Sequence, residues 1–123
     1  KGLQLVGLKL MQMTQELASK HYAEHTERPF YPGLVKFMTA SPLVAIALRG
    51  PGAVAVARKL MGATFGTDAD AGTIRGDFGC SKSYNLIHGS DSPESAEREL
   101  ALFFPEGVCD WSPISADWLW DNE

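Results

Sequence analysis

Residues 85–92 read Asn-Leu-Ile-His-Gly-Ser-Asp-Ser, and this stretch says more about the fold than any other part of the chain. Its apolar first half predicts a short strand over 84–88, and Ser92-Pro93-Glu94 predicts the start of a helix. A histidine at the end of a strand, followed by a turn and a helix, is exposed where two elements meet. His88 is therefore a candidate nucleophile, and the alternative is a histidine packed at a strand end.

Outward from this stretch, the sequence pattern predicts further strands and helices. We expect strands over 3–11 and 43–48, helices over 14–24, 32–39, 53–61 and 92–103, a long loop over 63–79, and irregular structure over 105–123. Thr14 is expected to cap the first helix, and Gly62 to end the third as a left-handed cap. This alternation fits a parallel α/β sheet or an antiparallel α+β sandwich, and periodicity does not choose between them.

Composition limits the class of protein. A chain of 123 residues with 45% hydrophobic and 21% charged content is typical of one soluble globular domain. Its formal net charge of -4 argues against stable binding to nucleic acid or to a membrane surface, so any phosphate site needs a local cluster of basic residues. The two cysteines, Cys80 and Cys109, indicate neither a disulfide framework nor a zinc site.

The same composition bears on localisation. No apolar run is long enough to cross a bilayer, and the first residues carry no basic leader. We expect a cytoplasmic protein, with an organelle as the alternative.

Several polar side chains are candidates for a site around His88. Glu99 lies on the helix predicted after it, where its carboxylate could fold back to the imidazole and fix the tautomer. Arg58 and Arg75 are candidates for binding an anion, because guanidinium groups match phosphate oxygens; the alternative for each is a solvated surface arginine. Thr64 could add a hydroxyl group.

Other candidates have weaker support. Phe30 could stack on a nucleobase or belong to the core, and Asn85 could contact a sugar hydroxyl or hydrogen-bond a loop. His21 and His25, spaced i and i+4, could bind a metal on one helical face, but no third ligand is evident and we give this hypothesis little weight. The sequence contains neither a P-loop motif nor a dinucleotide-binding glycine fingerprint.

Residues 85–92 resemble the active-site signature of the nucleoside diphosphate kinases. The resemblance extends to Gly-Thr-Ile-Arg-Gly-Asp-Phe at 72–78 and, upstream, to His21-Tyr22 and to segments 28–30 and 32–36, in the family's order and spacing. It covers essentially the whole chain. It implies a ferredoxin-like α+β domain, in which helices pack on a four-stranded antiparallel sheet, assembled into homo-oligomers of four or six subunits.

The resemblance also implies an activity and roles for particular residues. In a ping-pong reaction, His88 would accept the terminal phosphoryl group of a nucleoside triphosphate and pass it to a nucleoside diphosphate, with Mg²⁺ bridging the phosphates rather than held by a protein metal site. Glu99 and Ser90 would orient the imidazole, and Tyr22 would lie close to it. The nucleotide-binding residues would be Arg58, Thr64 and Arg75 for the phosphates, Phe30 for the base and Asn85 for the ribose.

The sequence departs from the family pattern at its start. The family domain begins with a strand carrying Lys-Pro-Asp and a helix, whereas residues 3–11 correspond to the strand that follows them. We therefore expect residues 1–123 to form one kinase domain without that first strand and helix. A second hypothesis follows from the same departure: a catalytically impaired nucleotide-binding or scaffold protein on the same fold.

Overall fold

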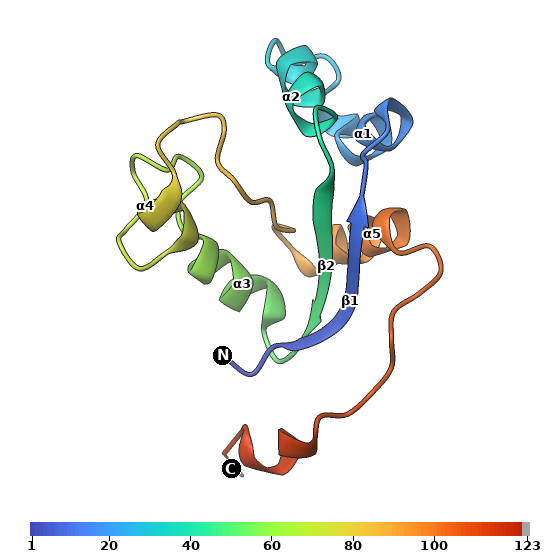
Figure 1. Cartoon of the computed structure of the whole chain (residues 1–123), viewed down its shortest axis with the longest axis vertical. Helices are drawn as coiled ribbons and strands as arrows, with labels where there is room; N and C mark the ends of the chain where they lie inside the picture. The colour runs from blue at the N-terminus through green and yellow to red at the C-terminus, as the bar shows by residue number, and fades with distance from the viewer. Residues whose placement is uncertain (122–123) are drawn as a thin grey trace.

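The computed structural model describes residues 1–121, and two antiparallel strands run through its centre (Figure 1). β1 (Gln4–Met11) pairs with β2 (Leu43–Arg49), and both strands were predicted. A bulge between Leu5 and Gly7 interrupts the register. Within residues 1–121 the sheet has two strands, fewer than the four that the resemblance implied, while the antiparallel α+β arrangement agrees with it.

One face of the sheet packs against the end of helix α5 (Pro93–Phe103). Val6, Ala45 and Ala47 are buried there with Phe104, the residue that caps this helix. A Cβ atom at Gly7 would lie only 2.8 Å from the Phe104 ring, so glycine permits this close approach. The small side chains of the sheet thus let α5 lie close to it and fix the position of the helix.

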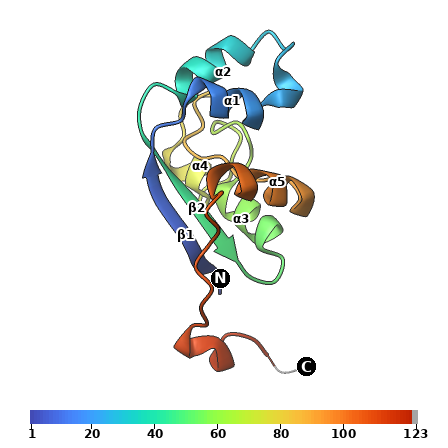
Figure 2. The same ribbon diagram turned by 90° about the vertical axis from the view of Figure 1, so that its right-hand side faces the viewer.

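The opposite face of the sheet is apolar and open. Leu8 stands opposite Ile46 and Leu10 opposite Val44, and these four side chains are between 54% and 75% exposed. We call them the aliphatic ladder. Figure 2 shows α3, α4 and α5 together on one side of the two strands. A contiguous exposed apolar surface of this kind commonly marks an interface.

Helices α1 (Gln15–His21) and α2 (Tyr31–Met38) lie at one end of the sheet (Figure 1). Thr14 caps α1 as predicted, because its hydroxyl oxygen accepts a hydrogen bond from the Leu17 amide at 3.1 Å. Met13, Ala18, Tyr22 and Val35 form a second core between the two helices. The helix predicted over 14–24 is wrong in its second part, where α1 ends and a separate 3₁₀ turn, η1 (Ala23–His25), follows.

Helix α3 (Ala53–Met61) has the predicted bounds, and it ends at Gly62. This glycine has a φ of 89° but a ψ of −179°, so it ends the helix without the left-handed conformation that was expected. The loop predicted over 63–79 is wrong at its end, where α4 (Ile74–Phe78) forms. Thr73 caps α4 by accepting a hydrogen bond from the Gly76 amide at 3.0 Å.

The strand predicted over 84–88 is wrong: this segment forms no strand in the structure. Leu86 has a φ of 71°, and the Ile87 amide donates to the Asn85 carbonyl at 2.8 Å, which turns the chain locally. The Arg75 side chain donates to the Asn85 and Ile87 carbonyls. Backbone acceptors that a neighbouring strand would use are therefore occupied by a side chain.

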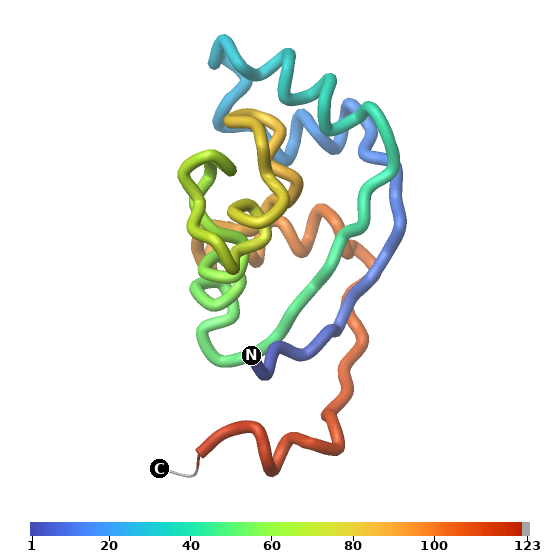
Figure 3. The backbone as a smooth tube through the Cα atoms, turned by 60° about the vertical axis from the view of Figure 1, so that its left-hand side comes forward, coloured from blue at the N-terminus to red at the C-terminus, as the bar shows by residue number. Residues whose placement is uncertain are grey.

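The segment after α5 runs back along the sheet to the end where the chain begins (Figure 3). The Cys109 amide donates to the Val6 carbonyl at 2.7 Å, and the Trp111 indole donates to the Leu5 carbonyl at 2.9 Å. A short 3₁₀ helix, η2 (Ile114–Trp118), interrupts the irregular structure predicted over 105–123, and residues 122 and 123 lie outside those described. None of the helices in residues 1–121 is long and apolar enough to cross a membrane.

Candidate active site

A pocket of ≈ 360 Å³ opens where α1, α3, α5 and the segment around His88 come together. This volume lies within the range of small-molecule sites. Seven of the nine predicted site residues line it, namely Tyr22, Arg58, Thr64, Arg75, Asn85, His88 and Glu99. Ser90 is in contact with Glu99, while Phe30 lies outside the lining.

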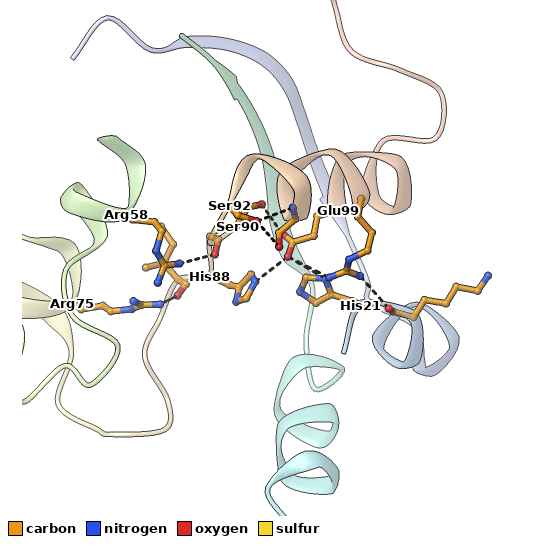
Figure 4. A network of polar contacts seen from close by, with 12 residues as sticks. His21, Arg58, Arg75, His88, Ser90, Ser92 and Glu99 are labelled. Carbon is orange, nitrogen blue, oxygen red and sulfur yellow. Dashed lines mark hydrogen bonds and ion pairs between the residues drawn. The ribbon is translucent and has the colours of Figure 1, made fainter. Parts of the chain in front are cut away.

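Glu99 is the centre of the polar contacts in the pocket (Figure 4). One carboxylate oxygen, Oε2, accepts a hydrogen bond from the Ser90 hydroxyl at 2.5 Å, and the other, Oε1, lies 3.8 Å from His88 Nε2. The Glu99 side chain is only 15% exposed, whereas that of His88 is 49% exposed. The carboxylate is thus held in place, and the imidazole in front of it stays open to a ligand.

This arrangement selects one form of the His88 imidazole. A carboxylate facing Nε2 favours the proton on that nitrogen, which leaves the Nδ1 lone pair free to attack. Burial lowers the pKa of His88, the Glu99 carboxylate opposes this, and Arg75 and Arg58 lower the pKa further. The lowered pKa favours the neutral form of the imidazole near pH 7.

Arg75 is almost fully buried, at 4% exposure, although the sequence left open a surface position. Its guanidinium donates to the Gly62 carbonyl at 3.1 Å, the Asn85 carbonyl at 3.2 Å and the Ile87 carbonyl at 2.5 Å. Burial, and then the positive charge of Arg58, lower its pKa. We call these three hydrogen bonds the Arg75 clamp; it holds the end of α3 against the segment that carries His88.

Arg58, Asn85 and Thr64 also join separate segments around the pocket. Arg58, in the last turn of α3, donates to the Gly89 carbonyl at 3.0 Å, directly beside His88. The Asn85 side-chain amide donates to the Thr64 carbonyl at 2.9 Å, which is the loop contact that the sequence left open for it. These groups therefore shape the pocket whether or not they also touch a ligand.

Two aromatic predictions have different outcomes. Tyr22 is buried, and its ring centroid lies 6.2 Å from that of His88, so the expected proximity is confirmed. Burial, and then the nearby Glu99 carboxylate, raise the pKa of Tyr22 to about 12. Phe30 is 53% exposed, and its ring centroid lies 5.6 Å from that of His25, a pocket residue. Phe30 thus lies near the pocket margin rather than in the core.

His21 lies in a different environment from the one that its sequence spacing predicted. The pair with His25 on one helical face, which was given little weight, does not exist, because α1 ends at His21. Instead, His21 Nδ1 lies 4.0 Å from Glu99 Oε1, and its ring centroid lies 4.9 Å from that of His88. Burial, and then the neighbouring His88, lower the pKa of His21 to about 4. Its position next to Tyr22 in the sequence was the signal that could have placed it in the pocket.

Comparisons with known proteins identify the family. A family model described as nucleoside diphosphate kinase matches residues 1–108. Nucleoside diphosphate kinases of Synechococcus sp. (strain JA-3-3Ab) and Gloeobacter violaceus are 57% and 54% identical to the chain over 122 residues, or 98% of this chain and 82% of each relative.

Solved structures agree with this result. A nucleoside diphosphate kinase of Halobacterium salinarum in complex with CDP has a TM-score of 0.93 and 46% identity, covering 98% of this chain and 81% of the other. A nucleoside diphosphate kinase family protein of Babesia bovis has a TM-score of 0.92 and 38% identity, covering 97% and 81%.

The fold and the histidine-centred pocket are those of a nucleotide phosphotransferase with the ferredoxin-like α+β architecture. The chain belongs to the nucleoside diphosphate kinase family. Its reaction is the transfer of a phosphoryl group from a nucleoside triphosphate to a nucleoside diphosphate. Enzymes of this family require a divalent cation.

Proposed function

We propose that His88 carries the phosphoryl group in a ping-pong reaction, with Nδ1 as the attacking nitrogen. The observation that supports this most strongly is the Ser90–Glu99–His88 arrangement, in which a carboxylate fixed by Ser90 faces Nε2 and leaves Nδ1 available. In the first half-reaction, a bond forms between Nδ1 and the terminal phosphorus while the bond from that phosphorus to the bridging oxygen breaks. The bonding electrons leave with the nucleoside diphosphate.

The second half-reaction reverses these steps with another nucleotide. A terminal phosphate oxygen of the incoming nucleoside diphosphate attacks the phosphorus, and the Nδ1–P bond breaks, which restores the neutral imidazole. While the phosphoryl group is attached, the ring retains its Nε2 proton and carries a positive charge. The Glu99 carboxylate, 3.8 Å away, stabilises that charge in both directions.

The remaining pocket residues support nucleotide binding in this proposal. Arg58, Thr64 and Arg75 line the pocket and would bind the phosphates, where the two guanidinium groups would offset the negative charge of the transferring group. Asn85 would reach the ribose, and the exposed Phe30 ring would stack on the base, with Tyr22 packing beside His88. Stacking reads little of the base edge, which is consistent with broad nucleotide specificity.

The cation of this reaction would be Mg²⁺ bound to the nucleotide phosphates. Within residues 1–121, the one cluster of three possible protein ligands contains two imidazoles, which Mg²⁺ does not prefer. The protein side chains therefore suit a cation that enters with its substrate. Mg²⁺ would neutralise phosphate charge there, while His88 forms and breaks the bond to phosphorus and Glu99 stabilises the charge on its ring.

Three further properties belong to this proposal. Residues 1–123 would act within a single kinase domain. The exposed aliphatic ladder supports assembly into homo-oligomers, tetramers or hexamers, because further protein would cover it. The two free, exposed cysteines support a reducing compartment such as the cytoplasm.

Phosphorylation of the protein by ATP tests the central step. After incubation with Mg²⁺ and ATP, the folded chain should carry acid-labile phosphate on His88, and added nucleoside diphosphate should remove it. The His88→Ala variant should carry none, whereas His25→Ala should retain the label. A folded wild-type chain that acquires no label, yet binds nucleotide, would favour the scaffold hypothesis instead.

A further inference from the structure

Three potential metal ligands from separate segments meet in the pocket. His21 comes from the last turn of α1, His88 from the segment before α5, and Glu99 from α5 itself. One ligand atom from each lies within 4.8 Å of the other two. Figure 4 shows both imidazoles directed toward the Glu99 carboxylate. None of these three side chains acts as a protein metal ligand in the reaction proposed for His88.

The Nδ1 atom of His21 is the observation that points to a ligand. The His21 side chain is 3% exposed, and within the described part of the chain Nδ1 is buried without a hydrogen-bond partner. Buried polar atoms normally have a partner, and one that lacks it is unfavourable. Its nearest acidic oxygen, Oε1 of Glu99, is 4.0 Å away, which is too long for a hydrogen bond. A cation between these atoms would give the Nδ1 lone pair a partner.

The donor set indicates which cation fits. Two imidazole nitrogens and one carboxylate oxygen are the three protein ligands of many zinc sites, in which a water takes the fourth position. Tetrahedral ligands around zinc are separated by about 3.3 Å. The separations from Glu99 Oε1, 3.8 Å to His88 Nε2 and 4.0 Å to His21 Nδ1, require a contraction of less than 1 Å. The three ligand atoms as a set lie within 4.8 Å of one another, so the two imidazoles require a contraction of up to about 1.5 Å toward each other. His88 is half exposed and can rotate to provide it.

We propose that His21, His88 and Glu99 form an inhibitory site for a borderline divalent cation such as Zn²⁺. A neutral imidazole carries one proton and one nitrogen lone pair. If the cation takes the Nε2 lone pair of His88, the proton moves to Nδ1, and this nitrogen can no longer attack phosphorus. The cation also withdraws Glu99 from its interaction with the imidazole. Inhibition rests on the proposed function, whereas binding of the cation does not.

The surrounding charges determine how tightly the site binds. The Arg98 guanidinium lies 3.8 Å from Glu99 Oε1 and would repel a cation, but its side chain is 45% exposed and can turn to solvent. Ser90 holds the other oxygen, Oε2, at 2.5 Å, so the carboxylate stays oriented toward the two imidazoles. A cation at Oε1 would therefore have to displace Arg98, while Ser90 keeps the carboxylate oriented.

Direct binding is tested on the full, untagged chain with Co²⁺ as a spectroscopic probe. Co²⁺ should bind one equivalent and give the visible absorption of a tetrahedral centre, and Zn²⁺ should displace it. The His21→Gln variant should lose roughly tenfold or more in affinity. His25→Gln is the matched control, since His25 lies outside the cluster, and it should bind like the wild type. Equal affinities of His21→Gln and wild type would overturn the proposal.

Imidazole ¹⁵N resonances of the wild-type chain provide a test that needs no variant. Zn²⁺ should shift the signals of His21 and His88 and leave those of His25 in place. A shift confined to His25 would overturn the site. This measurement decides the matter even if His21→Gln does not fold, which circular dichroism would show.

Inhibition is tested by the phosphorylation of His88. Zn²⁺ should block labelling by Mg²⁺-ATP, a chelator should restore it, and His21→Gln should require roughly tenfold more Zn²⁺ for the same block. Binding of Zn²⁺ with unchanged labelling would overturn the inhibitory role. If the chelated wild-type chain is never labelled, the proposed function fails, while the Co²⁺ and ¹⁵N measurements still decide whether the cation site exists.

Discussion

Replacement of Arg75 by methionine is the perturbation that separates positioning from phosphate binding. The change keeps the apolar stem of the side chain and removes the guanidinium, so the carbonyls of Gly62, Asn85 and Ile87 lose their donor. A hydrogen bond from a charged group contributes about 1.5–3 kcal/mol. The three bonds share one guanidinium and are not additive, so we expect the free energy of unfolding to fall by about 3–5 kcal/mol.

Urea denaturation followed by circular dichroism measures this change. Arg75→Lys keeps the positive charge but cannot reach three carbonyls with a planar fork, so its loss should be intermediate. Arg28→Met is the matched control, because Arg28 is exposed, and it should change stability by less than about 0.5 kcal/mol. A loss below about 1 kcal/mol in Arg75→Met would refute the clamp.

The kinetics of the same variants separate the two roles. If Arg75 mainly positions the segment that carries His88, Arg75→Lys should lower kcat with little change in KM. If Arg75 mainly binds phosphate, the lysine variant loses the guanidinium fork at the phosphates and should raise KM instead. The structure leads us to expect the first result, because all three guanidinium nitrogens already donate to backbone carbonyls.

The other predictions concern the three side chains of the metal-ligand cluster. His88→Ala should abolish phosphoryl transfer and change the free energy of unfolding by less than about 1 kcal/mol, since the side chain is half exposed; residual transfer above a percent of wild type would contradict it. Glu99→Gln should keep the fold and lower kcat by roughly 10²–10⁴, because the positive ring loses its carboxylate. Single-turnover labelling of His88 would measure this loss. Burial holds the pKa of His21 at about 4, against 6.5 when unfolded, so the unfolded chain binds more protons below pH 6.5. The contribution of His21 to the free energy of unfolding should therefore be fully present above pH 6.5. It should decrease as the pH falls toward 4, by about 2 kcal/mol between pH 8 and pH 5. His21→Phe should reduce this slope in urea titrations with a chelator present, leaving the smaller part due to His88, and an unchanged slope would show that another group is responsible.

Local sequence signals predicted the elements that depend on local physics. Alternating aliphatic residues indicated β1, a short uncharged apolar run indicated β2, alanine-rich composition indicated α3, and Ser92 followed by proline indicated the start of α5. These elements are stabilised by caps and by one buried face. The residues that specify each of these elements are neighbours in the sequence, so a local pattern is enough to predict the element.

The failures share a different cause, which is contact between residues distant in sequence. Residues 84–88 have a strand-like composition, but Arg75 occupies the carbonyls of Asn85 and Ile87, and no local pattern shows that. Helical spacing suggested only a weakly supported pair of His21 with His25, and α1 stops too early for a shared face. The site residues from the family motif lie together, whereas the role of His21 needed the packing of α1 against α5.

The Arg75 clamp also has a consequence for how insertions would be tolerated. Arg75 joins the end of α3 at Gly62 to the segment at 85–87, so it divides the long connection between them into two shorter loops. The entropy of closing a loop grows only with the logarithm of its length, about 0.6 kcal/mol for each doubling. Residues added within 64–72 or 79–84 should therefore cost little while the clamp holds. Removing the clamp would merge the two loops into one longer loop, and the segment that carries His88 would then be held by the Arg58–Gly89 and Asn85–Thr64 hydrogen bonds alone.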